Sequence, residues 1–181
     1  MRVSIRKLAL MAVLTAIALI VFIIEAQIQL PLPIPGTKLG LANTVTLFAL
    51  FFVKRSDNTS ISLGTVDAFM ILICRLILGA VFSGRIIAFL YSLAGGLLAF
   101  LVQALLRRFV SEKQVWVCGV FGAIFHNLGQ ILMAAFIMGT LRVVAYLPLL
   151  IIAGVITGVI TGLIAQFSLR IRGNGNNGNN I

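Results

Sequence analysis

Hydrophobic residues fall in long runs separated by short polar segments, and this pattern predicts membrane-spanning helices. The runs are apolar on all sides instead of along one stripe, and most of them approach the about 20 residues that a bilayer crossing needs. We expect spans at residues 8–28, 39–53, 61–81, 85–106, 115–138 and 143–167. The second run is short, so it is tilted, enters the membrane only partway, or includes loop residues in its crossing. The chain is therefore predicted to be an all-α, polytopic membrane protein with six transmembrane helices.

The first run could instead be a secretory signal peptide, because Arg2, Arg6 and Lys7 precede it. It is too long for that role, and no small-x-small cleavage site follows it. Composition supports the membrane class: 61% of the 181 residues are hydrophobic and 10% are charged, with a mean hydropathy of +1.16. A soluble domain carries about 25% charged residues.

A proline cluster separates the first two runs. Pro31, Pro33 and Pro35 supply three of the four prolines in the chain. Proline lacks an N–H and forces the residue before it into an extended conformation, so this stretch cannot be helical. Gly36 and Gly40 then allow the backbone to turn. An irregular loop between two apolar helices is where we expect a ligand to bind.

Basic residues predict the orientation of the spans, because lysine and arginine prefer the cytoplasmic side. With the N-terminus inside, ten of the 14 basic residues lie in cytoplasmic segments: Arg2, Arg6, Lys7, Lys54, Arg55, Arg107, Arg108, Lys113, Arg170 and Arg172. Both termini are thus predicted to be cytoplasmic. We expect one transmembrane domain at 1–172 and a disordered Gly/Asn tail at 173–181. The charge forms no basic patch with interleaved aromatic residues, so nucleic acid is not an expected partner.

Polar residues inside the spans converge on one region near the outer side. His126 and Gln130 are four residues apart and share a helix face. Ionisable residues in spans are costly and usually face a cavity or a partner. We therefore expect an outward-opening substrate site formed by Glu25, Lys38, Asn43, Arg75, His126, Asn127 and Gln130. Its positive balance, with Arg85 nearby, suits an anionic ligand.

Each of these residues also has a structural interpretation. Arg75 can pair with Glu25 or extend to the headgroups, and the polar residues of the fifth span can be hydrogen-bonding contacts between helices. Asp67 lies on the inner side and is expected to form a structural pair or a cap.

Two stripes of small residues predict close contacts between helices. Gly154, Gly158 and Gly162 repeat every four residues in the sixth span, where internal packing is the expected role. Ala9, Ala12 and Ala16 form a stripe in the first span that either packs internally or docks another membrane protein.

Several residue combinations resemble a known family. They are Pro33-Ile-Pro-Gly-Thr-Lys-Leu-Gly-Leu-Ala-Asn43, Ser92-Leu-Ala-Gly-Gly96, His126-Asn-Leu-Gly-Gln130 and Tyr146-Leu-Pro148. The chain resembles the bacterial Gx transporter family, whose members are often labelled heptaprenyl diphosphate synthase component I. The six-span plan and the alanine stripe also resemble substrate-binding S components of energy-coupling-factor transporters.

The resemblance implies a bacterial cytoplasmic membrane protein that binds a small-molecule substrate in the lipid bilayer. It also implies a transmembrane coupling protein, docked through the alanine stripe, and ATPase subunits as partners. In S components the first outer loop helps to close over the substrate. Relatives in flavin- and quinone-linked electron transfer widen the range of expected ligands.

The residues argue against an enzyme. Prenyl diphosphate synthases bind Mg²⁺-diphosphate through clustered aspartates, yet the only aspartates are Asp57 and Asp67. No phosphate-binding loop for ATP is present, and Cys74 and Cys118 lack metal-binding spacing. We expect no catalytic residues, metal or cofactor. Three hypotheses remain: an uptake subunit, an accessory subunit of prenyl diphosphate or quinone synthesis, and a membrane scaffold of an electron-transfer chain.

Overall fold

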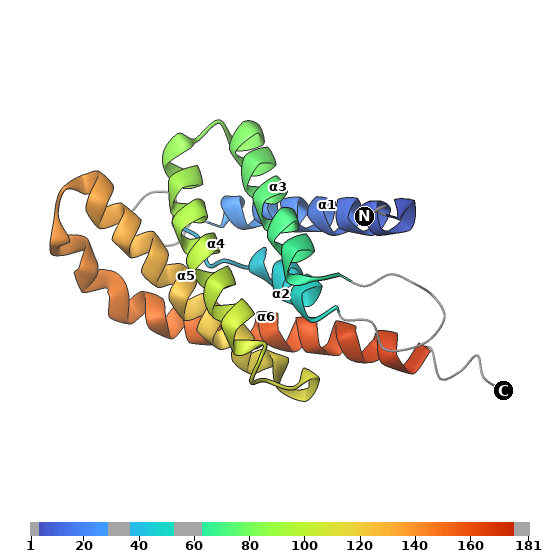
Figure 1. Ribbon diagram of the computed structural model, residues 1–181. Coiled ribbons are helices and arrows are strands. Elements are labelled where there is room, and N and C mark those ends of the chain that lie inside the picture. Colours follow the sequence, from blue (N-terminus) through green and yellow to red (C-terminus); the bar gives the residue numbers. More distant parts are fainter. Residues whose placement is uncertain (1–3, 29–36, 53–62, 176–181) are drawn as a thin grey trace.

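The computed structural model describes residues 4–28, 37–52 and 63–175. In these ranges the chain is all-α and contains no strand, as the hydrophobic pattern predicts. Six α-helices and two short 3-10 helices follow one another (Figure 1): α1 (Ile5–Gln27), α2 (Asn43–Phe51), α3 (Thr65–Ser83), α4 (Ile86–Leu106), η1 (Glu112–Gln114), α5 (Val115–Met138), η2 (Leu141–Tyr146) and α6 (Leu147–Gly175).

Five helices within the described ranges are long and apolar enough to cross a membrane, namely α1, α3, α4, α5 and the stretch Leu141–Ile171 that contains α6. The predicted span at 39–53 is different, because α2 has nine residues. A helix of that length is about 14 Å long, less than half of the about 30 Å hydrocarbon core. The prediction of six long spans is therefore correct for five segments.

The short α2 has a local cause. Segment 37–42 precedes it as non-helical backbone buried inside the bundle, and Gly40 has a left-handed φ of 82°. A non-helical backbone at this depth is tolerated where it is buried in protein. The prolines of the predicted loop at 31–35 lie outside the described residues.

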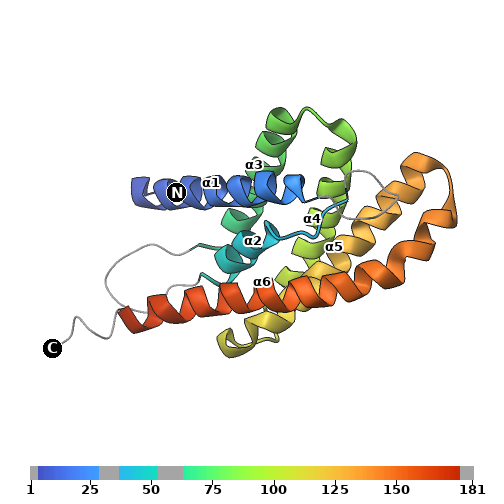
Figure 2. The ribbon, with the colours of Figure 1, turned by 180° about the vertical axis from the view of Figure 1, so that it is seen from behind.

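The beginning of α1 and the end of α6 lie at the same end of the molecule, seen from both sides (Figures 1 and 2). At that end Lys7 forms a 2.8 Å ion pair with Asp67, whose carboxylate also accepts the Gly64 backbone N–H at 2.6 Å. The structural role expected for Asp67 is therefore confirmed. α6 ends at Gly175, beyond the predicted domain boundary at 172.

Glycines form the contact between α5 and α6. A Cβ atom on Gly158 would lie 2.6 Å from the Cα of Val120, and one on Gly162 would lie 2.6 Å from the Cα of Trp116. Only glycine lets the two backbones approach this closely. The internal packing predicted for the glycine stripe of α6 is confirmed, and it fixes α5, which carries His126 and Gln130.

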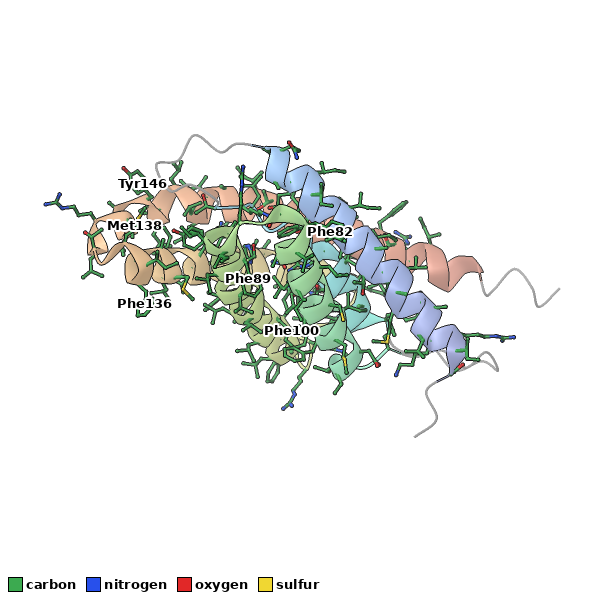
Figure 3. All side chains as sticks on the ribbon, turned by 90° about the horizontal axis from the view of Figure 1, so that it is seen from above. Phe82, Phe89, Phe100, Phe136, Met138 and Tyr146 are labelled. Carbon is green, nitrogen blue, oxygen red and sulfur yellow. The ribbon has the colours of Figure 1, made fainter. Side chains whose placement is uncertain are left out.

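Large apolar side chains cover the outside of the bundle, as a lipid environment requires. Phe136 and Phe82 are 83% and 68% exposed, and Figure 3 shows Phe136 at the edge of the bundle. Polar side chains, in contrast, gather inside. The polar side chains inside the bundle are therefore the candidates for a functional site.

Candidate functional site

Segment 37–42 enters the bundle and pairs with α5 through its backbone. The Lys38 N–H donates to Gln130 Oε1 at 3.1 Å, and Gln130 Nε2 donates to the Lys38 carbonyl at 3.1 Å. These two bonds fix which end of the Gln130 amide is nitrogen. They also explain why a glutamine is fully buried at mid-helix in α5.

A chain of polar side chains continues from Gln130 into the centre of the bundle. Gln130 Nε2 lies 2.7 Å from His126 Nε2, and His126 Nδ1 lies 3.0 Å from Asn43 Nδ2. Asn43 Oδ1 then accepts a hydrogen bond from Arg75 Nη2 at 3.1 Å. Three helices, α2, α3 and α5, thus contribute to one buried network.

The network leaves one amide N–H without a good acceptor. Lys38 and Arg75 orient the two amides so that both Gln130 and Asn43 present nitrogen to the imidazole. A neutral imidazole accepts at only one ring nitrogen. The Gly95 backbone lies on the Nδ1 side of the ring, where a Cβ on Gly95 would come within 2.8 Å of Nδ1. One of the two amide N–H groups that face the ring is therefore left without an acceptor there.

Arg75 is a buried cation with few partners. The residue is 2% exposed, its Nε has no hydrogen-bond partner, and no carboxylate within the described ranges lies within 4 Å of its nitrogens. The direct ion pair with Glu25 that would give Arg75 a purely structural role is therefore not formed. A buried charge normally has a close partner of opposite sign.

Glu25 and Lys38 complete the cluster. The Glu25 carboxylate accepts the backbone N–H of Gly40 and interacts with that of Leu41, so it holds segment 37–42 against α1. Lys38 Nζ lies 3.2 Å from the centre of the Phe22 ring. The cluster therefore brings two basic side chains, Lys38 and Arg75, together with one acidic side chain, Glu25.

The structure thus brings together six of the seven residues expected in the site. The seventh, Asn127, points to α6 and donates to the Leu150 carbonyl at 2.6 Å. Its Oδ1 is buried without a partner. Asn127 was expected either to bind substrate or to form a hydrogen-bonding contact between helices. The structure contains the contact between helices.

Two residues that position the site were not predicted. Gly95 of α4 gives His126 its space, because a Cβ there would lie 2.7 Å from the His126 carbonyl oxygen. Phe22 supports Lys38 from α1. Gly95 lies in the segment 92–96 that carries the resemblance, but its contact with α5 requires the tertiary structure.

The alanine stripe of α1 faces outward. Ala9, Ala12 and Ala16 are all exposed, whereas the buried residues of α1 lie on the opposite face: Leu14, Ala18, Phe22 and Glu25. Of the two roles considered for this stripe, packing inside the chain is excluded. A second feature at the surface, a hollow between α3 and α4, does not touch the cluster.

Metal chemistry has no support in the described ranges, where no three histidine, cysteine, aspartate or glutamate residues come together to hold an ion. No curated protein and no solved structure gives a significant match to the chain. A family model does match, over residues 14–168, and its description is heptaprenyl diphosphate synthase component I. The match covers the whole buried cluster, all of α3, α4 and α5, and most of α1 and α6. This multi-pass membrane protein belongs to the heptaprenyl diphosphate synthase component I family.

Proposed function

We propose that this protein is the substrate-binding membrane subunit of a transporter, similar to the S components of energy-coupling-factor systems. Its substrate is a small anionic or amphipathic molecule bound by Lys38, Asn43, Arg75, His126 and Gln130. Glu25 anchors segment 37–42, and Asn127 supports the helix contact behind the site. The membrane is the bacterial cytoplasmic membrane, with the beginning of α1 and the end of α6 inside.

The observation that carries the proposal is the environment of Arg75. Within the described ranges, its guanidinium is buried, donates to one neutral amide and has no carboxylate within 4 Å. Arginine is suited to carboxylate and phosphate groups because it offers a planar set of N–H donors. An anionic group beside Arg75 would accept hydrogen bonds from the guanidinium and from an amide N–H of the network.

Segment 37–42 gives the site a cover. The backbone groups of Lys38 and Gly40 in this segment are bonded to two polar side chains, Gln130 and Glu25. Hydrogen bonds of this kind can be exchanged for bonds to a ligand. The arrangement described here is the closed one, and the bound molecule would enter when the segment moves from Gln130.

The exposed alanine stripe supports the proposal that another membrane protein docks on α1. Small residues at a helix surface let a second helix approach closely in the membrane. Ala9, Ala12 and Ala16 lie near the end of α1 that the basic residues assign to the cytoplasm. The partner would be a transmembrane coupling protein that brings ATPase subunits, since this chain has no ATP-binding loop.

The family description favours a second candidate function, a non-catalytic membrane subunit of prenyl diphosphate or quinone synthesis. In that case the chain would bind a soluble synthase instead of an ATPase module. The buried cluster would then hold a product or a regulatory anion.

The first experiment is mass spectrometry of small molecules that copurify with gently extracted protein. We compare wild type with Arg75→Met, which keeps the side-chain bulk, and with Arg85→Met, which removes an exposed arginine near the same end. A stoichiometric anionic compound that is retained by wild type and Arg85→Met but lost by Arg75→Met supports the binding site. A compound that Arg75→Met retains at wild-type level argues against it.

Proteomics of the same preparations separates the two candidate functions. An ATPase module that is lost in Ala12→Trp but retained in Ile24→Trp supports uptake, because Ile24 is an exposed α1 residue away from the stripe. Recovery of a prenyl synthase with both variants supports the accessory subunit.

A further inference from the structure

A hollow with a volume of about 470 Å³ opens where α3 begins and α4 ends. Its lining residues are Thr65, Leu101, Ala104, Leu105, Arg107 and Arg108. None of them belongs to the buried cluster. Thr65 precedes Arg75 by ten residues on α3, which corresponds to about 15 Å along a helix. Thr65 begins α3, and Asp67 two residues later pairs with Lys7 of α1, so the hollow lies near the end of the molecule where α1 begins.

Two arginines, Arg107 and Arg108, line this hollow. Arg107 and Arg108 directly follow Leu106, the last residue of α4. Arg107 Nη1 donates to Thr65 Oγ1 at 3.1 Å, and neither arginine has an ion-pair partner within the described ranges. Asp67, the acidic residue nearest to Thr65 in the chain, is already paired with Lys7. Arginine guanidinium groups and a hydroxyl at the edge of an apolar hollow are suited to a phosphate group.

Part of the lining is apolar and belongs to the outer surface of α4. Leu101 and Leu105 are 63% and 58% exposed and lie four residues apart, on the same face of the helix. The hollow therefore combines two arginines and a hydroxyl with exposed apolar side chains near the end of α4.

We propose that this hollow binds a phosphate-bearing lipid. Arg107 and Arg108 contact the phosphate, and an apolar chain lies along Leu101 and Leu105. Basic pockets between transmembrane helices at the cytoplasmic surface bind anionic headgroups in this manner. The proposal does not depend on the transport function, because the site shares no residue with the Arg75 cluster.

The test is native mass spectrometry of the full-length protein released from detergent micelles containing phosphatidylglycerol or the zwitterionic phosphatidylcholine. We expect wild type to retain phosphatidylglycerol, and the retained fraction to fall about tenfold in the Arg107→Gln, Arg108→Gln double variant. The matched control is Lys113→Gln, Arg170→Gln, which removes two exposed cations from the same end outside the hollow. It should retain the lipid as wild type does.

An equal loss in both double variants would overturn the proposal, because it would indicate general attraction to a basic surface. So would unchanged retention in the Arg107, Arg108 variant. Ala104→Trp provides a second test, since it fills the hollow while keeping both arginines, and it should also release the lipid. Full retention by Ala104→Trp contradicts a lipid in the hollow.

Competition with farnesyl diphosphate distinguishes two sources of the same chemistry. Displacement of phosphatidylglycerol at equimolar farnesyl diphosphate, in wild type only, assigns the site to a prenyl diphosphate. Retention of phosphatidylglycerol under that condition assigns it to a membrane phospholipid. Both outcomes support a phosphate-bearing lipid. A thermal unfolding midpoint within the wild-type range shows for each variant that the fold is intact.

Discussion

At the scale of single residues, Gly95 determines whether His126 can occupy its position. A Cβ on Gly95 would lie 2.7 Å from the His126 carbonyl oxygen and 2.8 Å from Nδ1, whereas one on Gly96 would meet a Leu72 methyl group at 3.3 Å. We expect Gly95→Ala to lower the free energy of unfolding by about 1–3 kcal/mol, as other overpacked sites do. Gly96→Ala should be close to neutral, because the leucine side chain can move and alanine favours the helix.

The measurement is the unfolding equilibrium of both variants in detergent micelles. Equal stability of Gly95→Ala and Gly96→Ala would show that His126 does not depend on contact with α4.

The sequence indicated which residues gather in the buried cluster, but not which hydrogen bonds join them. Arg75, His126 and Gln130 stand out because ionisable and amide side chains are costly within apolar helices. Asn43 joins Arg75 to His126, whereas Gln130 is oriented by the backbone of Lys38, and backbone groups carry no signal in the sequence. Asn127 was grouped with His126 because the two are adjacent, yet adjacent helical residues point about 100° apart. Asn127 accordingly contacts α6 instead.

At the scale of elements, the sequence pattern predicted the packing of α6 correctly but not the length of α2. The glycine repeat of α6 predicted a close helix contact, because four-residue spacing aligns small residues on one face. For 39–53 the same apolar signal predicted a longer helix than the chain forms. Lys38 and Gly40, at the start of this run, bond to Gln130 and Glu25, and Gly40 has a left-handed φ of 82° that an α-helix does not contain. These contacts and the turn at Gly40 set where α2 begins.

The contact between α5 and α6 should be the least tolerant of added volume. Gly158→Ala places a methyl group 2.6 Å from the Cα of Val120, and a backbone atom cannot move aside as a side chain can. We expect the helices to separate and the free energy of unfolding to fall by about 2 kcal/mol or more. Ile160→Ala, at a half-exposed position on the same helix, should cost less. The check is resistance to unfolding in a detergent titration. A Gly158→Ala protein as resistant as Ile160→Ala would contradict tight backbone contact.

At the scale of the whole molecule, the short α2 decides the topology. Five long helices alone would place the two termini on opposite sides of the membrane, because an odd number of crossings inverts the chain. The beginning of α1 and the end of α6 nevertheless lie at the same end (Figures 1 and 2). We predict that segment 37–52 returns the chain, with its non-helical part and α2 together making a sixth crossing. Most basic residues of the described ranges lie at this end, which predicts that it is cytoplasmic.

Reporter fusions separate five crossings from six. We expect green fluorescent protein to fluoresce when it is fused at either terminus, since both are cytoplasmic in the six-crossing arrangement. Alkaline phosphatase fused after Gly139, at the turn between α5 and α6, should be active because that turn is extracytoplasmic. A fusion after Arg108 should be inactive. If the terminal reporters gave opposite results, α2 would not complete a crossing. Lys38 and Arg75 would then have to be reached by a ligand from the side that the basic residues mark as cytoplasmic, and an uptake role would lose its physical basis.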